Sequence, residues 1–492
     1  MTAGKVAAIF DVGKTNKKLL LFNQEYQLVK ETSVQLPETT DEDGFACEDV
    51  HALTNWVITN FEELSMSTEY QLAALNFSSY GASFVHLDKS GEPCCPLYNY
   101  LKLYPDNLKN AFYNRYGGEE DFSMLTASPV LGSLNSGMQL YRLKHEQPDL
   151  FAKIRTSLHL PQYLNYILSG KTCTDITSVG CHTNLWNFRS NSYHQWVNLE
   201  KIDDKFAPVV LGDALVNDPG TSRQPPIGIG LHDSSAALIP YLQHFRDPFI
   251  LISTGTWCIS MNPFNKDPLT KEELRNDCLC YLTYKGEPVK SSRLFAGNEH
   301  EKQIKRLGDF FHKNDQAVSQ IRFNKEIYDS LVRQSLPGQS SVGQPSVGQS
   351  SVEHSSIGQS SVGQPASKDK GSPSLITGGS AFSNREIAEF PDYETAYHQL
   401  MIDIMVQQVA STRLVMNATG VKQIFVDGGF SKNEIYMNLL SMSFPEITVS
   451  AATVPQSTGL GAALAIHKHW NKNLIPQNLI QLKTYHSKSD LL

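Results

Sequence analysis

Two glycine-containing turns, each lying between short apolar runs, occur about half a chain apart in this sequence of 492 residues. The first, Asp11–Lys18, lies between Val6–Phe10 and Lys18–Phe22, and the second is Ser253–Trp257. Apolar runs of this length predict strands, so each segment is predicted to be a β-hairpin. Glycine lets the turn approach a phosphate closely, and the turn amides can donate hydrogen bonds to it. The pair therefore predicts a duplicated α/β fold that grips a polyphosphate between its halves.

Gly13-Lys14-Thr15 also matches the end of a P-loop, but the surrounding sequence excludes that alternative. A P-loop needs G-x-x-x-x-G-K-[ST] between a strand and a helix, because helix-terminal N–H groups cradle the phosphates. The first glycine would fall at Ala8, and the residues after Thr15 are strand-forming. The hairpin is the better prediction.

Composition and patterning favour a globular α/β protein. Hydrophobic residues make up 40% of the chain and charged residues 19%. Strand patterns such as Ala73–Ser78 alternate with helical ones, including residues 136–169 and 395–418. We therefore predict two domains, 1–246 and 247–492, hinged near residues 243–250.

Charge and cysteine usage restrict the partners and the compartment. A net charge of −8 argues against a nucleic-acid partner. The eight cysteines form no C-x-x-C pair and predict reduced structural thiols. No signal peptide and no apolar run approaching 18 residues is found, so no membrane partner is expected and the predicted location is cytoplasmic.

Residues 336–373 differ from the rest of the chain. They contain near-copies of Ser-Ser-Val-Gly-Gln, as in Ser340–Gln344 and Ser360–Gln364, and are rich in Ser, Gly, Gln and Pro. Such a segment cannot bury enough apolar surface to offset its ordering entropy. We expect a disordered insertion in the second half.

Two further segments carry possible chemistry. Asp233 follows Gly228–His232 and precedes the predicted helix Ser234–Leu242. Alone, an aspartate at that point is usually a helix N-cap. Asp427–Asn433 follows the predicted strand Gln423–Val426, and its small residues would let a flat nucleobase lie against the backbone. A plain strand–turn–helix connection is the alternative.

Together these segments resemble the FGGY carbohydrate kinases, a family in the superfamily of hexokinase, actin and the heat-shock chaperone ATPases. Asp11–Lys18 and Ser253–Trp257 resemble its two phosphate motifs, and Asp427–Asn433 resembles its adenosine motif. Residues 232–237 look most like rhamnulokinase. The resemblance covers nearly the whole chain except 336–373. It implies two ribonuclease-H-like, actin-like ATPase domains with a catalytic cleft between them.

The resemblance also implies roles for single residues. Asp233 would be the general base that takes the proton of the attacking hydroxyl. Asp11 would hold hydrated Mg²⁺. Residues expected at the ATP are Asp11, Gly13, Lys14, Thr15, Asn16, Lys18, Gly255, Thr256, Gly428, Gly429 and Asn433. Residues expected at the sugar are Tyr80, Gly81, Ser83, Asn99, His232 and Asp233.

The implied reaction is phosphoryl transfer from Mg·ATP to a hydroxyl of a small sugar, a ketose of the rhamnulose, fuculose or xylulose type. Rhamnulokinases usually carry an acidic residue at the position of Ser83 and charged residues around Tyr100, so the sugar stays open. A glycerol or polyol kinase, and an actin-like nucleotide-binding regulator without acceptor, are the alternatives. A homodimer is compatible with the sequence, which does not fix the oligomeric state.

Deleting residues 338–370 and joining the ends with a short Gly/Ser linker should leave catalysis and melting temperature nearly unchanged. The segment holds almost no large apolar residues, and doubling a flexible loop costs only about 0.6 kcal/mol. Limited proteolysis of the intact chain should cut this stretch first. Protection of residues 338–370, or a deletion variant that melts many degrees lower, would contradict the prediction.

Overall fold

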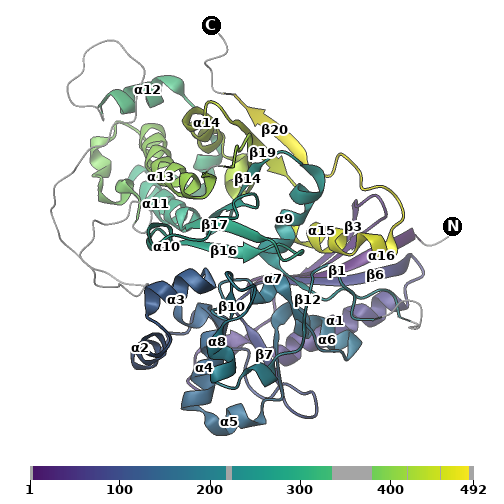
Figure 1. The fold of residues 1–492 in the computed structure, drawn as a ribbon. Coiled ribbons are helices and arrows are strands. Elements are labelled where there is room, and N and C mark those ends of the chain that lie inside the picture. Colours follow the sequence, from purple (N-terminus) through teal and green to yellow (C-terminus); the bar gives the residue numbers. More distant parts are fainter. Residues whose placement is uncertain (1–3, 218–223, 335–378, 418, 455, 487–492) are drawn as a thin grey trace.

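The computed structural model describes residues 4–217, 224–334, 379–417, 419–454 and 456–486. Two β-sheets with their helices form two halves, the first in the lower part of Figure 1 and the second in the upper part. The predicted insertion, 336–373, lies outside the described residues.

The sheet of the first half has five strands in the order β13-β6-β1-β2-β3. β1 lies at its centre and pairs antiparallel with β2, which pairs antiparallel with β3. On the other side β1 pairs parallel with β6, and β6 pairs parallel with β13. The bounds are β1 (Gly4–Val12), β2 (Lys17–Phe22), β3 (Leu28–Val34), β6 (Tyr70–Ser79) and β13 (Leu231–His232).

The sheet of the second half repeats this arrangement. Its order is β16-β17-β15-β14-β18-β19-β20, and its five inner strands have the order and directions of the first sheet. The bounds are β14 (Phe249–Thr254), β15 (Cys258–Asn262), β16 (Cys278–Leu282), β17 (Pro288–Leu294), β18 (Gln423–Gly428), β19 (Thr448–Thr453) and β20 (Gln481–Tyr485). The predicted fold, two ribonuclease-H-like halves of the actin-like ATPase type, is confirmed.

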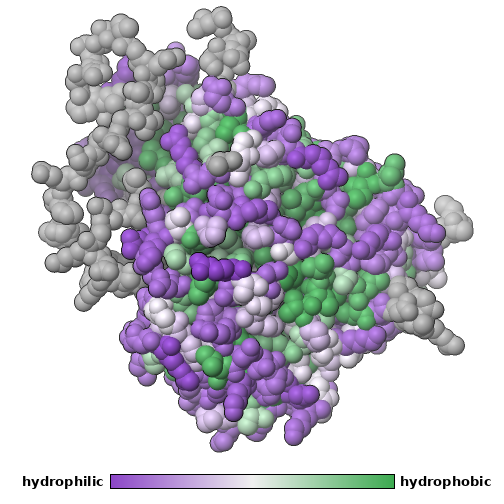
Figure 2. Space-filling view, in the orientation of Figure 1, coloured by the Kyte–Doolittle hydropathy of each residue, from purple (hydrophilic) through white to green (hydrophobic). Residues whose placement is uncertain are grey.

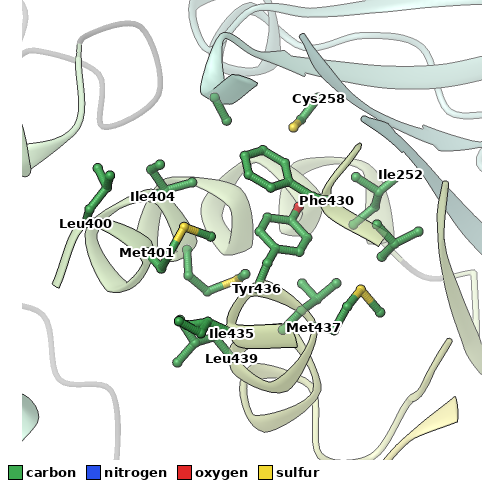
Figure 3. Close-up of a cluster of buried hydrophobic side chains, with 14 of the residues drawn as sticks. Ile252, Cys258, Leu400, Met401, Ile404, Phe430, Ile435, Tyr436, Met437 and Leu439 are labelled. Carbon is green, nitrogen blue, oxygen red and sulfur yellow. The ribbon is translucent and has the colours of Figure 1, made fainter. Parts of the chain in front are cut away.

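Helices cover the sheets and supply the cores. In the second half α11 (Ala296–Phe311), α13 (Tyr393–Met416) and α14 (Glu434–Ser443) pack with the sheet around one buried cluster. Figure 3 shows Ile252 of β14 facing Tyr436 and Phe430 within it. In the first half α1 (Val50–Ser65) and α6 (Leu160–Ser169) pack with the sheet around a second cluster.

Smaller elements complete the chain. In the first half they are β4 (Glu38–Thr40), β5 (Ala46–Glu48), β7 (Phe84–Leu87), α2 (Asp106–Arg115), α3 (Glu119–Thr126), α4 (Ser136–Glu146), α5 (Pro148–Lys153), β8 (Thr156–His159), β9 (Thr174–Asp175), α7 (Ile176–Val179), β10 (Trp186–Asn187), β11 (Ser192–Tyr193), α8 (Gln195–Leu199) and β12 (Val209–Val210). In the second half they are α10 (Lys271–Arg275), α12 (Lys325–Gln334) and α16 (His467–Trp470).

The predicted helical stretch 136–169 is wrong at one point, because β8 interrupts it between α5 and α6. β8 pairs antiparallel with β7, with Phe84 opposite His159. The two rings stack with centroids 4.1 Å apart. This pairing joins segments far apart in the sequence, so the local apolar period gives no sign of it.

The face of the molecule in Figure 2 carries both hydrophilic and hydrophobic side chains. Figure 2 shows hydrophilic side chains over most of the face, with hydrophobic ones in patches between them. Within the described residues, no helix combines the length and the apolar character that a membrane span requires.

The two halves meet where α9 (Asp233–His244) lies beside α15 (Ser457–Ala465), as Figure 1 shows. α9 follows β13 in the first half, and α15 follows β19, the equivalent strand of the second. At their contact a Cβ on Gly461 would lie 1.8 Å from the carbonyl oxygen of Ala236. Only glycine therefore allows this approach.

Gly461→Ala should destabilise the protein by about 1–3 kcal/mol, the usual range for overpacking. Alanine is the better helix former by about 1 kcal/mol, so a net loss would come from the helix contact. Urea unfolding measures it. Gly4→Ala, where no atom lies within 4 Å of the added Cβ, is the control and should be neutral. A Gly461→Ala variant as stable as the wild type would contradict the close contact.

Candidate functional site

Asp233 lies at the point where β13 ends and α9 begins. The N-cap of α9 is His232, and the Asp233 carboxylate does not cap the helix. Its Oδ1 accepts the Ser234 N–H at 2.6 Å, and His232 Nε2 lies 3.2 Å away. Among the described residues, Oδ2 has no hydrogen-bond partner. Asp233 is therefore not the N-cap of α9, and its Oδ2 is free to bind another group.

Asp11 faces the same region from the end of β1. Thr458, in the first turn of α15, donates a hydrogen bond from Oγ1 to Asp11 Oδ2 at 2.7 Å. Burial raises the pKa of Asp11 to about 6; the Thr458 hydrogen bond opposes this rise, and the charge of Asp233 adds to it. Burial likewise raises the pKa of Asp233 to about 6. Two carboxylates whose negative charges interact in a partly desolvated site are suited to a divalent cation. The positive charge of the cation would offset the charge of both carboxylates.

The first predicted hairpin is present, with β1 and β2 joined by a tight turn. The Gly13 N–H donates to the Asn16 carbonyl at 2.9 Å, and Thr15 and Asn16 are exposed at the tip. A strand follows this turn, as predicted, where a P-loop would have a helix. The predicted hairpin is therefore confirmed, and its contact with phosphate stays a prediction.

The lysines of this hairpin are already paired. Lys14 contacts Glu38 at 3.0 Å, and Lys18 donates to Gln456 Oε1 at 2.9 Å and lies 3.3 Å from Glu31. Contact of Lys14 and Lys18 with phosphate stays a prediction, since either must share its charge with a carboxylate. The pairing partners come from distant segments, which the local sequence does not reveal.

The second hairpin is joined to the predicted adenosine turn. Gly255 and Thr256 are exposed between β14 and β15. Just before them, Thr254 Oγ1 donates to the Asp427 carbonyl at 2.5 Å and accepts the Phe430 N–H at 3.0 Å. One hydroxyl thus holds the phosphate-type turn against the turn at Gly428.

The glycines of this region have distinct roles. Gly428 has φ +85°, and a Cβ there would lie 1.9 Å from the Thr254 carbonyl oxygen. A Cβ on Gly255 or on Gly429 would meet no atom within 4 Å. The first glycine therefore permits close packing of strand ends, and the other two border open space into which a nucleotide could fit.

Asn433 is the N-cap of α14. Its Oδ1 accepts the Tyr436 N–H at 3.0 Å, and its Nδ2 donates to the Tyr397 hydroxyl at 2.7 Å. Behind this turn the Phe430 and Tyr436 rings stack in parallel, with centroids 4.6 Å apart (Figure 3). One amide hydrogen of Asn433 remains for a nucleobase, so that contact stays a prediction.

Several residues predicted for the sugar surround Asp233. A Cβ on Gly81 would lie 2.9 Å from His232 Cδ2, so the Gly81 backbone lies directly on that ring. The rings of Tyr80 and Tyr100 meet edge to face at 5.9 Å. Burial raises the pKa of Tyr100, and the charge of Asp233 adds to this rise. His232 therefore adjoins the Asp233 carboxylate with Gly81 on its ring, and Tyr80 lies next to Tyr100, on which that carboxylate acts.

Asn99 and Ser83 differ from this group. The Asn99 amide donates to the Ala46 carbonyl at 2.9 Å and accepts the Leu101 N–H at 3.0 Å. Ser83 is buried, and its carbonyl accepts the Leu160 N–H. Their contact with a sugar stays a prediction. Of the neighbours Asn99 and Tyr100, it is Tyr100 whose pKa, raised by burial, is raised further by the charge of Asp233.

His232 is neutral and held on several sides. Burial lowers its pKa to about 3. Its Nε2 lies 3.0 Å from Cys181 Sγ, and its ring stacks on Tyr281 of β16 at 5.5 Å. Its main-chain N–H donates to Thr177 Oγ1 at 2.9 Å.

Sequence reasoning missed a buried ion pair beside the site. Lys17 of the first hairpin is paired with Glu48 of β5, and the Tyr80 hydroxyl donates to Glu48 Oε2 at 2.6 Å. Glu48 thereby connects the phosphate-type turn to the sugar segment. Nothing in its local sequence distinguishes Glu48 from a surface glutamate.

Comparison with curated proteins finds relatives among the sugar kinases. A curated relative, the rhamnulokinase of Halalkalibacterium halodurans, is 22% identical over 269 residues, which are 51% of this chain and 54% of that protein. The match thus spans about half of its length.

Two solved structures share the fold. A carbohydrate kinase from Novosphingobium aromaticivorans has a TM-score of 0.75 at 20% identity, covering 99% of this chain and 95% of that one. The xylulose kinase of Lactobacillus acidophilus has a TM-score of 0.70 at 16% identity, covering 98% and 94%.

Family descriptions match in both halves. "FGGY family of carbohydrate kinases, N-terminal domain" matches residues 6–239, and "Carbohydrate kinase FGGY, C-terminal domain" matches residues 246–333. The chain belongs to the FGGY family of carbohydrate kinases.

Proposed function

We propose that the protein transfers the γ-phosphoryl group of Mg·ATP to a hydroxyl of a ketose. The observation that carries the proposal is the pair of carboxylates, Asp11 and Asp233, each with its pKa raised to about 6 by burial and each at the end of a strand of the first sheet. Family membership and the two phosphate-type hairpins support it.

Asp233 acts as the general base. The Ser234 N–H and His232 hold Oδ1, so Oδ2 is oriented to take the proton of the attacking hydroxyl. A pKa of about 6 leaves the carboxylate ionised at pH 7 and makes it a stronger base than an ordinary aspartate. Because neutral His232 adds no positive charge beside it, this basicity is retained.

Asp11 and the two hairpins receive Mg·ATP. Asp11 would hold the hydrated ion, with Thr458 fixing its carboxylate, and the metal would supply charge neutralisation at the phosphates. Amides of the turns at Gly13 and Gly255 would bind phosphate oxygens, and the turn at Gly428–Gly429 would accept the adenosine. We place the boundary at residue 246, so that 1–246 binds the sugar, carries Asp233 and supplies the first phosphate turn, and 247–492 binds the nucleotide.

A ketose fits the residues around Asp233. The aromatic faces of Tyr80 and Tyr100 suit the apolar faces of a sugar, and the Tyr100 hydroxyl suits its polar edge, since the Tyr80 hydroxyl is bound to Glu48. The relatives named rhamnulokinase and xylulose kinase support this class. A polyol kinase and a regulator without acceptor are the alternatives.

A substrate panel tests the proposal. ADP release from Mg·ATP would be measured with L-rhamnulose, L-fuculose, D-xylulose, glycerol and D-gluconate. Acceptor-dependent release with a ketose supports the proposal. Release with glycerol alone would show a polyol kinase, and nucleotide binding without any acceptor-dependent release would favour the regulator.

Asp233→Asn should lower ketose phosphorylation by roughly 10²–10⁴-fold, the usual contribution of a general base. It should also stabilise the protein at pH 7. The native pKa lies above the unfolded value of 3.8, so the native state binds more protons between pH 4 and 6, and wild-type stability falls as the pH rises through that window. The gain at pH 7 is about 1 kcal/mol once the exposure of the carboxylate is allowed for.

Kinetics and thermal unfolding at pH 4.5 and pH 7 check both parts. Asp204→Asn, at an exposed aspartate whose side chain is 59% accessible, is the matched control and should change neither. Wild-type turnover in Asp233→Asn would remove Asp233 from the mechanism.

A further inference from the structure

Two buried glutamines lie behind the residues that surround Asp233. Gln139 is on α4 and is 5% exposed, and Gln162 is on α6 and is fully buried. Neither has a role in the proposed chemistry. In both, the side-chain amide donates to two main-chain carbonyls. A residue that only fills the core would not need this donor.

Gln139 holds a turn in an unfavourable conformation. Its Nε2 donates to the Ala82 carbonyl at 2.7 Å and to the Ser133 carbonyl at 2.6 Å. Ala82 has φ +62°, in the left-handed region that residues with a Cβ rarely adopt. Ala82 follows Gly81, whose backbone lies on His232. The amide therefore fixes the turn that packs against the catalytic segment.

Gln162 holds the other side of the same site. Its Nε2 donates to the Gly230 carbonyl at 2.9 Å and to the Ile229 carbonyl at 3.3 Å. Gly230 has φ +84°, and its N–H donates to Asn76 Oδ1 at 3.1 Å. The chain continues from Gly230 into β13 and Asp233. A second amide thus fixes the backbone that leads into the base.

The oxygens of these glutamines argue against a filling role. Oε1 of Gln139 and Oε1 of Gln162 are buried and have no hydrogen-bond partner among the described residues. A buried unpaired acceptor destabilises a protein, whereas methionine would fill a similar volume without it. Gln139 also borders a small cavity of about 30 Å³, large enough for a water. The donor groups are what distinguishes glutamine from methionine at both positions.

We propose that Gln139 and Gln162 are positioning residues, each using one side-chain amide to hold main-chain carbonyls at a left-handed residue beside the acceptor site. This inference rests on the proposed function only for its kinetic consequence. Gln139 fixes the backbone at Ala82 and, through the adjacent Gly81, the position of the His232 ring. Gln162 fixes the backbone at Gly230 and, through β13, the position of Asp233. Loss of either amide loosens the acceptor site and leaves the nucleotide turns intact.

The kinetic test uses Gln139→Met and Gln162→Met with the ketose that the wild type phosphorylates fastest among L-rhamnulose, L-fuculose and D-xylulose. We expect kcat/KM for the ketose to fall roughly 10- to 100-fold, with KM for ATP within about twofold of wild type. Unchanged kcat/KM in both variants, or an equal rise in KM for ATP, would overturn the proposal.

Gln408→Met is the matched control. Gln408 is fully buried on α13, its Nε2 donates to Ser260 Oγ at 3.1 Å and Thr412 Oγ1 at 3.0 Å, and its Oε1 is also unpaired among the described residues. It holds side chains of the second half and no main-chain carbonyl beside Asp233. It should change melting temperature as the other variants do and leave the ketose kinetics unchanged.

Ala82→Gly separates positioning from general loosening of the core. Glycine adopts positive φ without the alanine penalty. In the Ala82→Gly background, the effect of Gln139→Met on ketose kcat/KM should therefore shrink roughly three- to tenfold, while the effect of Gln162→Met should not change. Strict additivity of Ala82→Gly and Gln139→Met would contradict the role assigned to Gln139.

Hydrogen exchange gives a readout that does not need a substrate. Peptides spanning residues 79–84 should exchange faster in Gln139→Met, and peptides spanning 227–233 faster in Gln162→Met, with neither altered in Gln408→Met. If the wild type phosphorylates no ketose, the proposed function fails, and this measurement still decides the positioning roles. Unaltered exchange in both segments would overturn them.

Discussion

Two carboxylates are held in a partly desolvated site at the ends of β1 and β13, and much of the structure serves to keep them there. Burial opposes the ionisation of Asp11 and Asp233, and their mutual repulsion adds to the penalty for Asp11. Such an arrangement persists only when the surrounding fold fixes it, and it stores the free energy that a cation and an acceptor hydroxyl would release on binding.

The duplicated fold provides that rigidity through contacts between its halves. α9 and α15 occupy equivalent places and touch at Gly461, where only a glycine allows the approach. α15 then brings Thr458 of the second half to Asp11 of the first. The site around Asp11 therefore contains residues of both halves. The first turns of α15 therefore both pack against α9, through Gly461, and orient an acidic side chain, through Thr458.

Short sequence patterns predicted those features of the site that depend only on neighbouring residues. The hairpins at Gly13 and Gly255, the turn at Gly428 and the place of Asp233 before a helix all follow from strand, turn and helix signals within about ten residues. The two-domain fold followed from the repetition of the hairpin. The roles of the named residues came from resemblance to a family, and the structure adds their geometry.

Contacts between distant segments could not be predicted in this way. The Lys18 partner Gln456 and the Asp11 partner Thr458 lie more than 400 residues along the chain, and β8 pairs with β7, which is about 70 residues earlier. The charge of Asp233 acts on Tyr100, whereas the amide of its neighbour Asn99 is used by the backbone. A one-residue choice within a loop depends on the packing around it.

The β16–β17 hairpin contacts the first half beside Asp233. Tyr281 of β16 lies on the His232 ring, and the Leu282 carbonyl accepts a hydrogen bond from Ser235 in the first turn of α9. These supports belong to the second half, whereas His232, Asp233 and Ser235 belong to the first. Any motion that parts the halves must therefore also separate the His232 ring from Tyr281. The surroundings of Asp233 are then complete only while the halves are together, so the environment of this carboxylate depends on the relative position of the two sheets.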